Sequence, residues 1–164
     1  MERLRPLAPD VAWVARDNVH LTLKFLGNVE TARLPGVEHA LAAAAAGQPA
    51  FDLAVHGLGA FPASTRARVL WAGVTAGGRE AVDLAAGVDD ALAALGFPRE
   101  TRPFAAHVTL GRVRAPRANP RLAAALDAPE PFGRQHVARV CLMRSELSPR
   151  GARYTELAAL PLAP

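Results

Sequence analysis

The chain alternates between two hydrophobic periodicities, one typical of strands and one typical of helices. Segments rich in β-branched and aromatic residues predict strands, and apolar residues spaced three or four apart predict helices. The second predicted helix has its apolar stripe at Val82, Ala85, Val88, Leu92 and Leu95. Strands are predicted at 10–15, 19–26, 51–61, 67–74, 105–113, 135–143 and 152–160. Helices are predicted at 31–46, ended by Gly47, at 79–95, ended by Gly96, and after Asn119, with Pro120 in its first position.

Short turns between consecutive predicted strands favour antiparallel pairing, and the fold class is therefore α+β. A chain of 164 residues fits a single domain, here 1–164. No linker or low-complexity boundary divides it. The tetrapeptide pattern His-x-Thr-Leu occurs on two predicted strands in opposite halves of the chain. This placement indicates two similar lobes that face each other.

Composition narrows the class of protein. About half of the residues are hydrophobic (51%), enough for a packed core, and no apolar run is long enough to cross a membrane. The opening MERLRPLAPD does not have the order of a signal peptide. A single cysteine, Cys141, excludes an internal disulfide and a zinc site built from cysteines. We therefore expect a cytoplasmic protein.

The net charge of +4 comes almost entirely from arginine, because Lys24 is the only lysine among 19 basic residues. Arginine makes bidentate bonds to phosphate and stacks on bases. The charge therefore favours an anionic partner such as a nucleic acid. Arg66 and Arg68 are candidates to reach such a phosphate. A basic loop that could follow an RNA backbone contains Arg112, Arg114, Arg117 and Arg121, and for the last two a solvated loop is the alternative.

The repeated motif appears as HLTLKF at 20–25 and as HVTLGR at 107–112. Side chains alternate along a strand, so His20 and Thr22 share one face, and His107 and Thr109 share one face likewise. Each pair then presents an imidazole and a hydroxyl about 7 Å apart at Cα, with leucine on the opposite, apolar face. If the two faces meet, the cleft between them holds two imidazoles and two hydroxyls.

These groups suit the opening of a cyclic phosphodiester by water. One imidazole takes the proton of the water, and the other protonates the ribose oxygen that leaves phosphorus. Histidine has an unperturbed pKa of about 6.5, so two histidines can hold opposite protonation states near neutral pH. Hydroxyls and an arginine can bind the non-bridging oxygens as negative charge develops on them, and no metal is required.

Two other interpretations compete with this one. A single His-x-Thr on a strand is more often a structural pair, but two copies before leucine are rarely coincidental. A metal site is the weaker functional alternative, because no Asp, Glu or further His keeps step with either pair.

At these residues the chain resembles the two-histidine (2H) phosphoesterases, and within them the RNA 2′,3′-cyclic phosphodiesterases. The resemblance also extends over GAFPASTRARVLWAGV and SELSPRGARYTEL, and together the matching segments span most of the chain from Trp13 to Leu160. It implies a bilobal fold with two antiparallel sheets facing a central groove and helices outside. It also implies hydrolysis of a 2′,3′-cyclic phosphate to a 2′-phosphomonoester, in some members accompanied by 2′–5′ RNA joining.

The resemblance assigns roles to individual residues. His20 matches the proton donor and His107 the proton acceptor, with no cofactor and no metal. The substrate-binding residues that it implies are Thr22, Thr109, Arg112 and Phe25. The implied partners are RNA ends or nucleotides that carry a 2′,3′-cyclic phosphate, bound by a monomer.

Two of these residues conflict with regular strand alternation. Arg112 and Phe25 fall on the face opposite their histidines if the strands stay regular. A bend at Gly111 would bring Arg112 to the phosphate, whereas for Phe25 base stacking competes with packing in the core.

The chain also departs from the family pattern. Ala106 stands where proline usually precedes the second histidine, and only MERLRPLAPD precedes the first predicted strand. We expect the family's first strand and helix to be missing, and Met1 to be a misassigned start or a truncation point.

The sequence leaves two alternative functions open. The same groups would serve a 2′–5′ RNA ligase in the reverse direction. A groove without turnover would make the protein a nucleotide- or RNA-binding module, although phosphate binding alone would be served by arginine or lysine.

Overall fold

The computed structural model describes residues 2–148 and 151–164, so the expectation about Met1 lies outside the described residues. The chain forms two compact units, each built from three separate segments. The first unit contains the segments up to Leu21, Leu53–Ala76 and Ala106–Arg134, and the second contains Thr22–Asp52, Gly77–Ala105 and Gln135–Pro164. Within the described ranges, no helix combines the length and the apolar character needed to cross a membrane.

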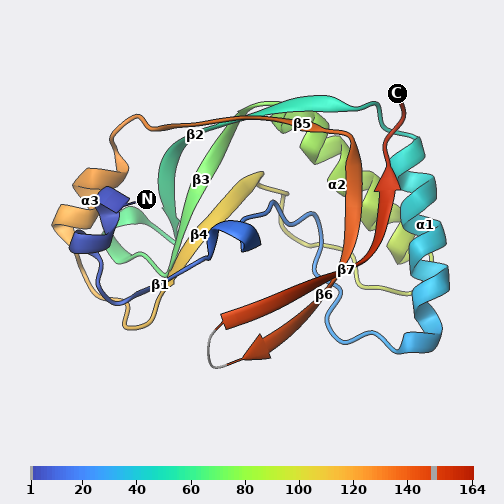
Figure 1. The fold of residues 1–164 in the computed structure, drawn as a ribbon, viewed down its shortest axis with the longest axis horizontal. Helices are drawn as coiled ribbons and strands as arrows, with labels where there is room; N and C mark the ends of the chain where they lie inside the picture. Colours follow the sequence, from blue (N-terminus) through green and yellow to red (C-terminus); the bar gives the residue numbers. More distant parts are fainter. Residues whose placement is uncertain (1, 149–150) are drawn as a thin grey trace. The chain divides into compact units, whose positions relative to one another are not determined.

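The first unit is built on a five-stranded sheet in the order β1-β4-β3-β2-β5 (Figure 1). The pairs β1–β4, β4–β3 and β3–β2 are antiparallel. The strands are β1 (Val11–Trp13), β2 (Phe51–Phe61), β3 (Val69–Ala76), β4 (His107–Val113) and β5 (Pro131–Val137). Strand β4 lies inside the sheet, which places the second histidine motif on a strand that has neighbours on both edges.

Short helical elements cover the apolar side of this sheet. The helix α3 (Pro120–Leu126) packs beside the 3₁₀ turn at Glu2–Leu7. The side chain of Asn119 accepts a hydrogen bond from the backbone N–H of Leu122 at 3.0 Å, which is the predicted N-cap. The core between these elements comprises Leu4, Ala8, Val11, Ala60, Ala67, Leu70, Leu122 and Leu126.

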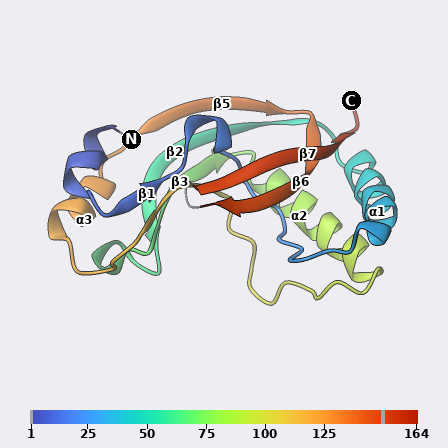
Figure 2. The same ribbon diagram turned by 60° about the horizontal axis from the view of Figure 1, so that its bottom comes forward.

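The second unit packs two helices against a hairpin. The helices α1 (Leu34–Ala46) and α2 (Gly78–Ala93) lie side by side (Figure 2), and the hairpin consists of β6 (Arg139–Ser148) and β7 (Gly151–Pro161). Helix α1 ends at the predicted Gly47 cap. The core comprises Val37, Leu41, Ala45, Leu84, Val88, Leu92, Phe97, Val140, Leu142, Leu160 and Leu162.

The structure confirms the α+β class with two antiparallel sheets and corrects three predicted elements. The predicted strand at 19–26 is wrong: among these residues, all described, only Leu21 forms a β-bridge. The predicted strand at 135–143 is divided into the end of β5 and the start of β6. The stripe of α2 is rotated, because Val82 and Leu95 are about 40% exposed while Ala81 and Leu84 are buried. Because α2 is rich in alanine, several faces of the helix are similarly apolar. Packing against α1 decides which of these faces is buried.

We predict that Leu92→Ala lowers the free energy of unfolding by about 2–5 kcal/mol, because this fully buried side chain would leave a cavity. The matched control is Val82→Ala on the same helix, where the side chain is 40% exposed and the change should stay within about 0.5 kcal/mol. Urea unfolding of both variants makes the comparison, and equal losses would contradict the packing described.

Candidate active site

Strand β4 brings three of the predicted site residues to one face of the sheet. It pairs with β3 at His107↔Gly73, Thr109↔Trp71 and Arg112↔Val69. Directly paired residues point to the same side, and alternate residues of β3 share a side. His107, Thr109 and Arg112 therefore share one face of the sheet.

A β-bulge makes this possible. The pairing passes from Thr109↔Trp71 directly to Gly111↔Leu70, so that Leu110 is an extra residue on β4. The bulge reverses the alternation and turns Arg112 to the side of His107, in agreement with the predicted bend. Gly111 is required beside it, because a Cβ there would meet Val11 Cγ1 and the carbonyl oxygen of Ala12 on β1.

The first motif meets the second through the antiparallel bridge between Leu21 and Val108. The bridge brings the chain directly after His20 beside β4, one residue from His107. Leu21 and Val108 pack with Leu110 and Ala72 in a small core. The bridge thus anchors the first motif by its leucine to the strand that carries His107.

The ring of His20 is oriented by the chain just before it. Its Nδ1 lies 2.7 Å from the carbonyl oxygen of Asn18. A carbonyl can only accept, so Nδ1 carries the hydrogen of this bond. His20 is exposed and His107 is half-buried, so the two imidazoles have different surroundings.

Two aromatic rings hold the second histidine. The ring of Phe61 meets His107 edge-on at a centroid distance of 5.1 Å, and Trp71 lies 6.4 Å from His107. Phe61 and Trp71 contact each other at 5.3 Å. The indole covers Gly59, where a Cβ would overlap ring carbons Cζ2 and Cη2 of Trp71. The ring of Trp71 is half-buried and lies on the face of His107.

The boundary between the two compact units runs through the first motif, between Leu21 and Thr22. Both His20 and His107 belong to the first compact unit, because the chain returns to the same sheet through residues 106–134. Opposite halves of a sequence need not be opposite halves of a fold. Thr22 follows Leu21 by one peptide bond and belongs to the second unit with Phe25, so the roles of these two residues stay predictions.

Other residues singled out from the sequence lie outside this face or at its margin. Arg66 and Arg68 are exposed, and Arg117 forms a 3.9 Å ion pair with Asp10. Phe25 is 77% exposed, which overturns its alternative assignment to the core. Among residues 2–148 and 151–164, no three His, Cys, Asp or Glu side chains gather as metal ligands would.

Sequence reasoning missed Phe61 and Gly59 as parts of the site. Their signal is the block GAFPASTRARVLWAGV, whose two strands β2 and β3 carry Phe61, Gly59 and Trp71 on paired positions. The pairing itself could not be read from the sequence, because β2 and β3 are joined with two register shifts.

The sequence of the chain is similar to those of known proteins. Residues 1–149 match the model of the 2′-5′ RNA ligase superfamily. A protein of Archaeoglobus fulgidus named RNA 2′,3′-cyclic phosphodiesterase is 36% identical over 164 residues, covering 95% of this chain and 90% of that protein. The protein of the same name from Methanothermobacter thermautotrophicus is 33% identical, with 95% and 85% covered.

Solved structures with the same fold are also similar in sequence. The crystal structure of TT0787 of Thermus thermophilus matches with a TM-score of 0.77 at 33% identity, covering 98% of this chain and 86% of that one. The crystal structure of E. coli LigT complexed with 3′-AMP matches with a TM-score of 0.75 at 30% identity, covering 98% and 88%.

We predict that Gly59→Ala destabilises the protein by about 1–3 kcal/mol, because the added methyl overlaps Trp71. The displaced indole should also change the tryptophan fluorescence. The control is Gly87→Ala on α2, where a Cβ meets nothing within 4 Å and helix propensity improves by about 0.5–1 kcal/mol. Unchanged stability and emission in Gly59→Ala would contradict the close contact.

Proposed function

The chain belongs to the 2′-5′ RNA ligase superfamily, and from this membership we propose that it hydrolyses 2′,3′-cyclic phosphates of RNA ends or nucleosides to 2′-phosphomonoesters. The observation that carries the proposal is the common face of His107, Thr109 and Arg112, beside which the Leu21–Val108 bridge sets His20. Two imidazoles, a hydroxyl and a guanidinium on one surface suit metal-independent phosphoryl chemistry. RNA 2′,3′-cyclic phosphodiesterase is also the name of the relatives compared above.

In the proposed reaction, His107 accepts a proton from water as the water oxygen forms a bond to phosphorus. The bond between phosphorus and the ribose 3′ oxygen breaks, and His20 donates the proton that this oxygen needs. The carbonyl of Asn18 keeps Nδ1 of His20 as a donor, so Nε2 delivers the proton. The order of the two roles follows the family resemblance.

The negative charge that shifts to the non-bridging oxygens needs donors already in place. Arg112 supplies a fixed positive charge on the face of His107, and Thr109 supplies a hydroxyl. Such preorganised donors stabilise the transition state more than the substrate. We propose that Thr22 adds the second hydroxyl and that Phe25 stacks on the base of the substrate. We further expect a monomer that works in the cytoplasm.

A joining reaction is the second candidate. The same groups would join a 2′,3′-cyclic phosphate to the 5′-hydroxyl of another RNA, because this hydroxyl can replace water as the nucleophile while the bond between phosphorus and the ribose 3′ oxygen breaks. The superfamily to which the chain belongs takes its description from this activity. Hydrolysis is favoured in water because water is in large excess over RNA ends.

The test is incubation with a nucleoside 2′,3′-cyclic phosphate in EDTA, followed by ³¹P NMR of the product. A 2′-monophosphate formed at an unchanged rate in EDTA is the expected result. A 3′-monophosphate or loss of turnover in EDTA would overturn the mechanism. Binding without turnover by folded protein would indicate the binding module instead, and a 2′–5′ linked product with added 5′-hydroxyl RNA would favour the ligase.

We predict that His20→Ala and His107→Ala each lower kcat by about 10²- to 10⁴-fold, the usual loss when a general acid or base is removed. His39→Ala is the matched control, since His39 is exposed on α1 and should leave kcat unchanged. The wild-type rate should fall at both low and high pH, because one imidazole must be protonated and the other neutral. A folded single variant with nearly normal turnover would disprove the two-histidine mechanism.

For Arg112→Ala, we predict a fall in kcat/KM of about 10- to 150-fold, which corresponds to the about 1.5–3 kcal/mol of one lost hydrogen bond to a charged group. Arg121→Ala, an exposed arginine of α3, should change kcat/KM little at 0.15 M salt. The values of kcat/KM are compared by steady-state kinetics of the two folded variants. Equal effects of the two substitutions would mean that the bulge at Leu110 does not bring Arg112 to the phosphate.

A further inference from the structure

The segment after the first histidine motif lacks the support that strands give. Of residues 20–29, which the structure describes in full, only Leu21 takes part in a β-bridge. Lys24 lies at the centre of this segment and is the only lysine of the chain. Its side chain is only 4% exposed, although lysine is almost never buried unless it is paired.

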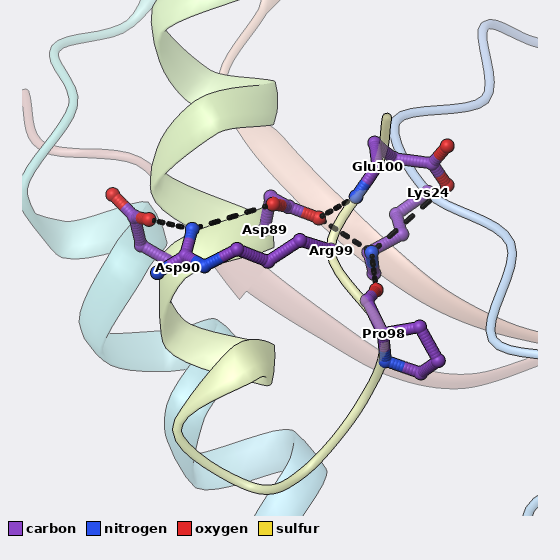
Figure 3. Close-up of polar contacts among 6 residues, drawn as sticks. All are labelled: Lys24, Asp89, Asp90, Pro98, Arg99 and Glu100. Carbon is purple, nitrogen blue, oxygen red and sulfur yellow. Dashed lines mark hydrogen bonds and ion pairs between the residues drawn. The ribbon is translucent and has the colours of Figure 1, made fainter. Parts of the chain in front are cut away.

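Lys24 is fully engaged within the second unit (Figure 3). Its Nζ donates to Oδ1 of Asp89 on α2 at 2.5 Å and to the carbonyl oxygen of Pro98 at 2.7 Å. Glu100 adds a carboxylate 3.9 Å away. One ammonium group therefore ties the segment both to a helix and to the loop that follows it.

The acceptor is itself held in place. Oδ1 of Asp89 accepts a second hydrogen bond from the backbone N–H of Glu100 at 3.1 Å, and Oδ2 lies 3.6 Å from Arg99. Arg99 also pairs with Asp90. The hydrogen bond from Lys24 is the chief cause that lowers the pKa of Asp89 below its usual value, so the carboxylate is charged at neutral pH.

The residues next to Lys24 in the chain differ in burial. Leu23 and Leu26 pack partly against the core of the second unit, whereas Phe25 is 77% exposed. An exposed aromatic ring therefore directly follows a nearly buried ammonium group in the chain. The ammonium fixes the backbone at the residue that directly precedes this ring.

We propose that Lys24 and Asp89 are a positioning pair, which holds Phe25 exposed so that its ring stacks on the base of the substrate. The inference rests on the proposed function and explains how the protein would bind the base of its substrate. Lys24 contacts no reacting atom in this scheme. It acts through Phe25, and its loss should raise KM for a substrate with a base while changing kcat little.

The test compares two substrates, a nucleoside 2′,3′-cyclic phosphate and ribose 2′,3′-cyclic phosphate, which has no base. Phe25→Ala should raise KM for the nucleoside by about 5- to 150-fold, the effect of one lost base–aromatic stack. Lys24→Met should raise it by at least about threefold and no more than Phe25→Ala does. Neither substitution should change KM for the ribose compound.

Two further variants separate positioning from folding. In a Phe25→Ala background, Lys24→Met should have no additional effect on KM, because the ring through which it acts is absent. The matched control is Arg79→Met, which removes the exposed Arg79–Asp83 ion pair of 3.8 Å on the same helix α2 and should leave KM unchanged. If Lys24→Met fails to fold, Asp89→Asn removes the acceptor charge and makes the same comparison.

The outcomes distinguish this inference from the function on which it rests. Wild-type protein without turnover of either cyclic phosphate overturns both. Wild-type turnover with a normal KM in folded Lys24→Met or Asp89→Asn overturns the positioning pair alone. An equal rise of KM for both substrates, or an additive effect in the Phe25→Ala background, also overturns it, because either result means that Lys24 does not act through the ring.

Discussion

Strand β4 is paired on both edges, and its register is the constraint on which the candidate site depends. On one edge it pairs with β3, and on the other it meets β1 near Gly111 and the first motif at Val108. A strand held from both sides cannot slip by one residue without exposing Val108 and Leu110 and burying His107. The hydrophobic contacts on one face thus determine which chemical groups stand on the other.

The bulge at Leu110 lets β4 keep apolar residues on one face and Arg112 on the other. Leu110 and Gly111 are both buried, and a regular strand would then turn Arg112 away from His107. The extra residue restores a common face for His107, Thr109 and Arg112. The close approach of Val11 explains why glycine is needed beside the bulge, since any side chain there would push β1 away.

The two copies of the motif are held in different ways, although their sequences are nearly the same. The second copy is part of a continuous ladder, and aromatic rings from β2 and β3 contact its histidine. The first copy has one β-bridge, a hydrogen bond from His20 to a backbone carbonyl and, four residues after the histidine, the ion pair of Lys24. Isolated contacts of this kind each need a partner from elsewhere in the chain, whereas a strand satisfies its backbone groups through its neighbours.

The sequence by itself determined the local elements and predicted a chemistry. Periodicity and the Gly, Pro and Asn signals act within a few residues. They predicted both long helices, the capped helix after Asn119 and five of the strands. The repeated His-x-Thr-Leu likewise pointed to paired acid and base without any coordinates. Only the tertiary structure decided that both histidines belong to one unit, that Arg112 shares the face of His107 and that Trp71 and Phe61 contact His107. These features depend on strand register, on a bulge and on contacts between residues far apart in the chain. The pattern of residues along the chain does not predict such contacts. Residues become cross-strand partners, and gain free energy from packing together, only when the sheet forms.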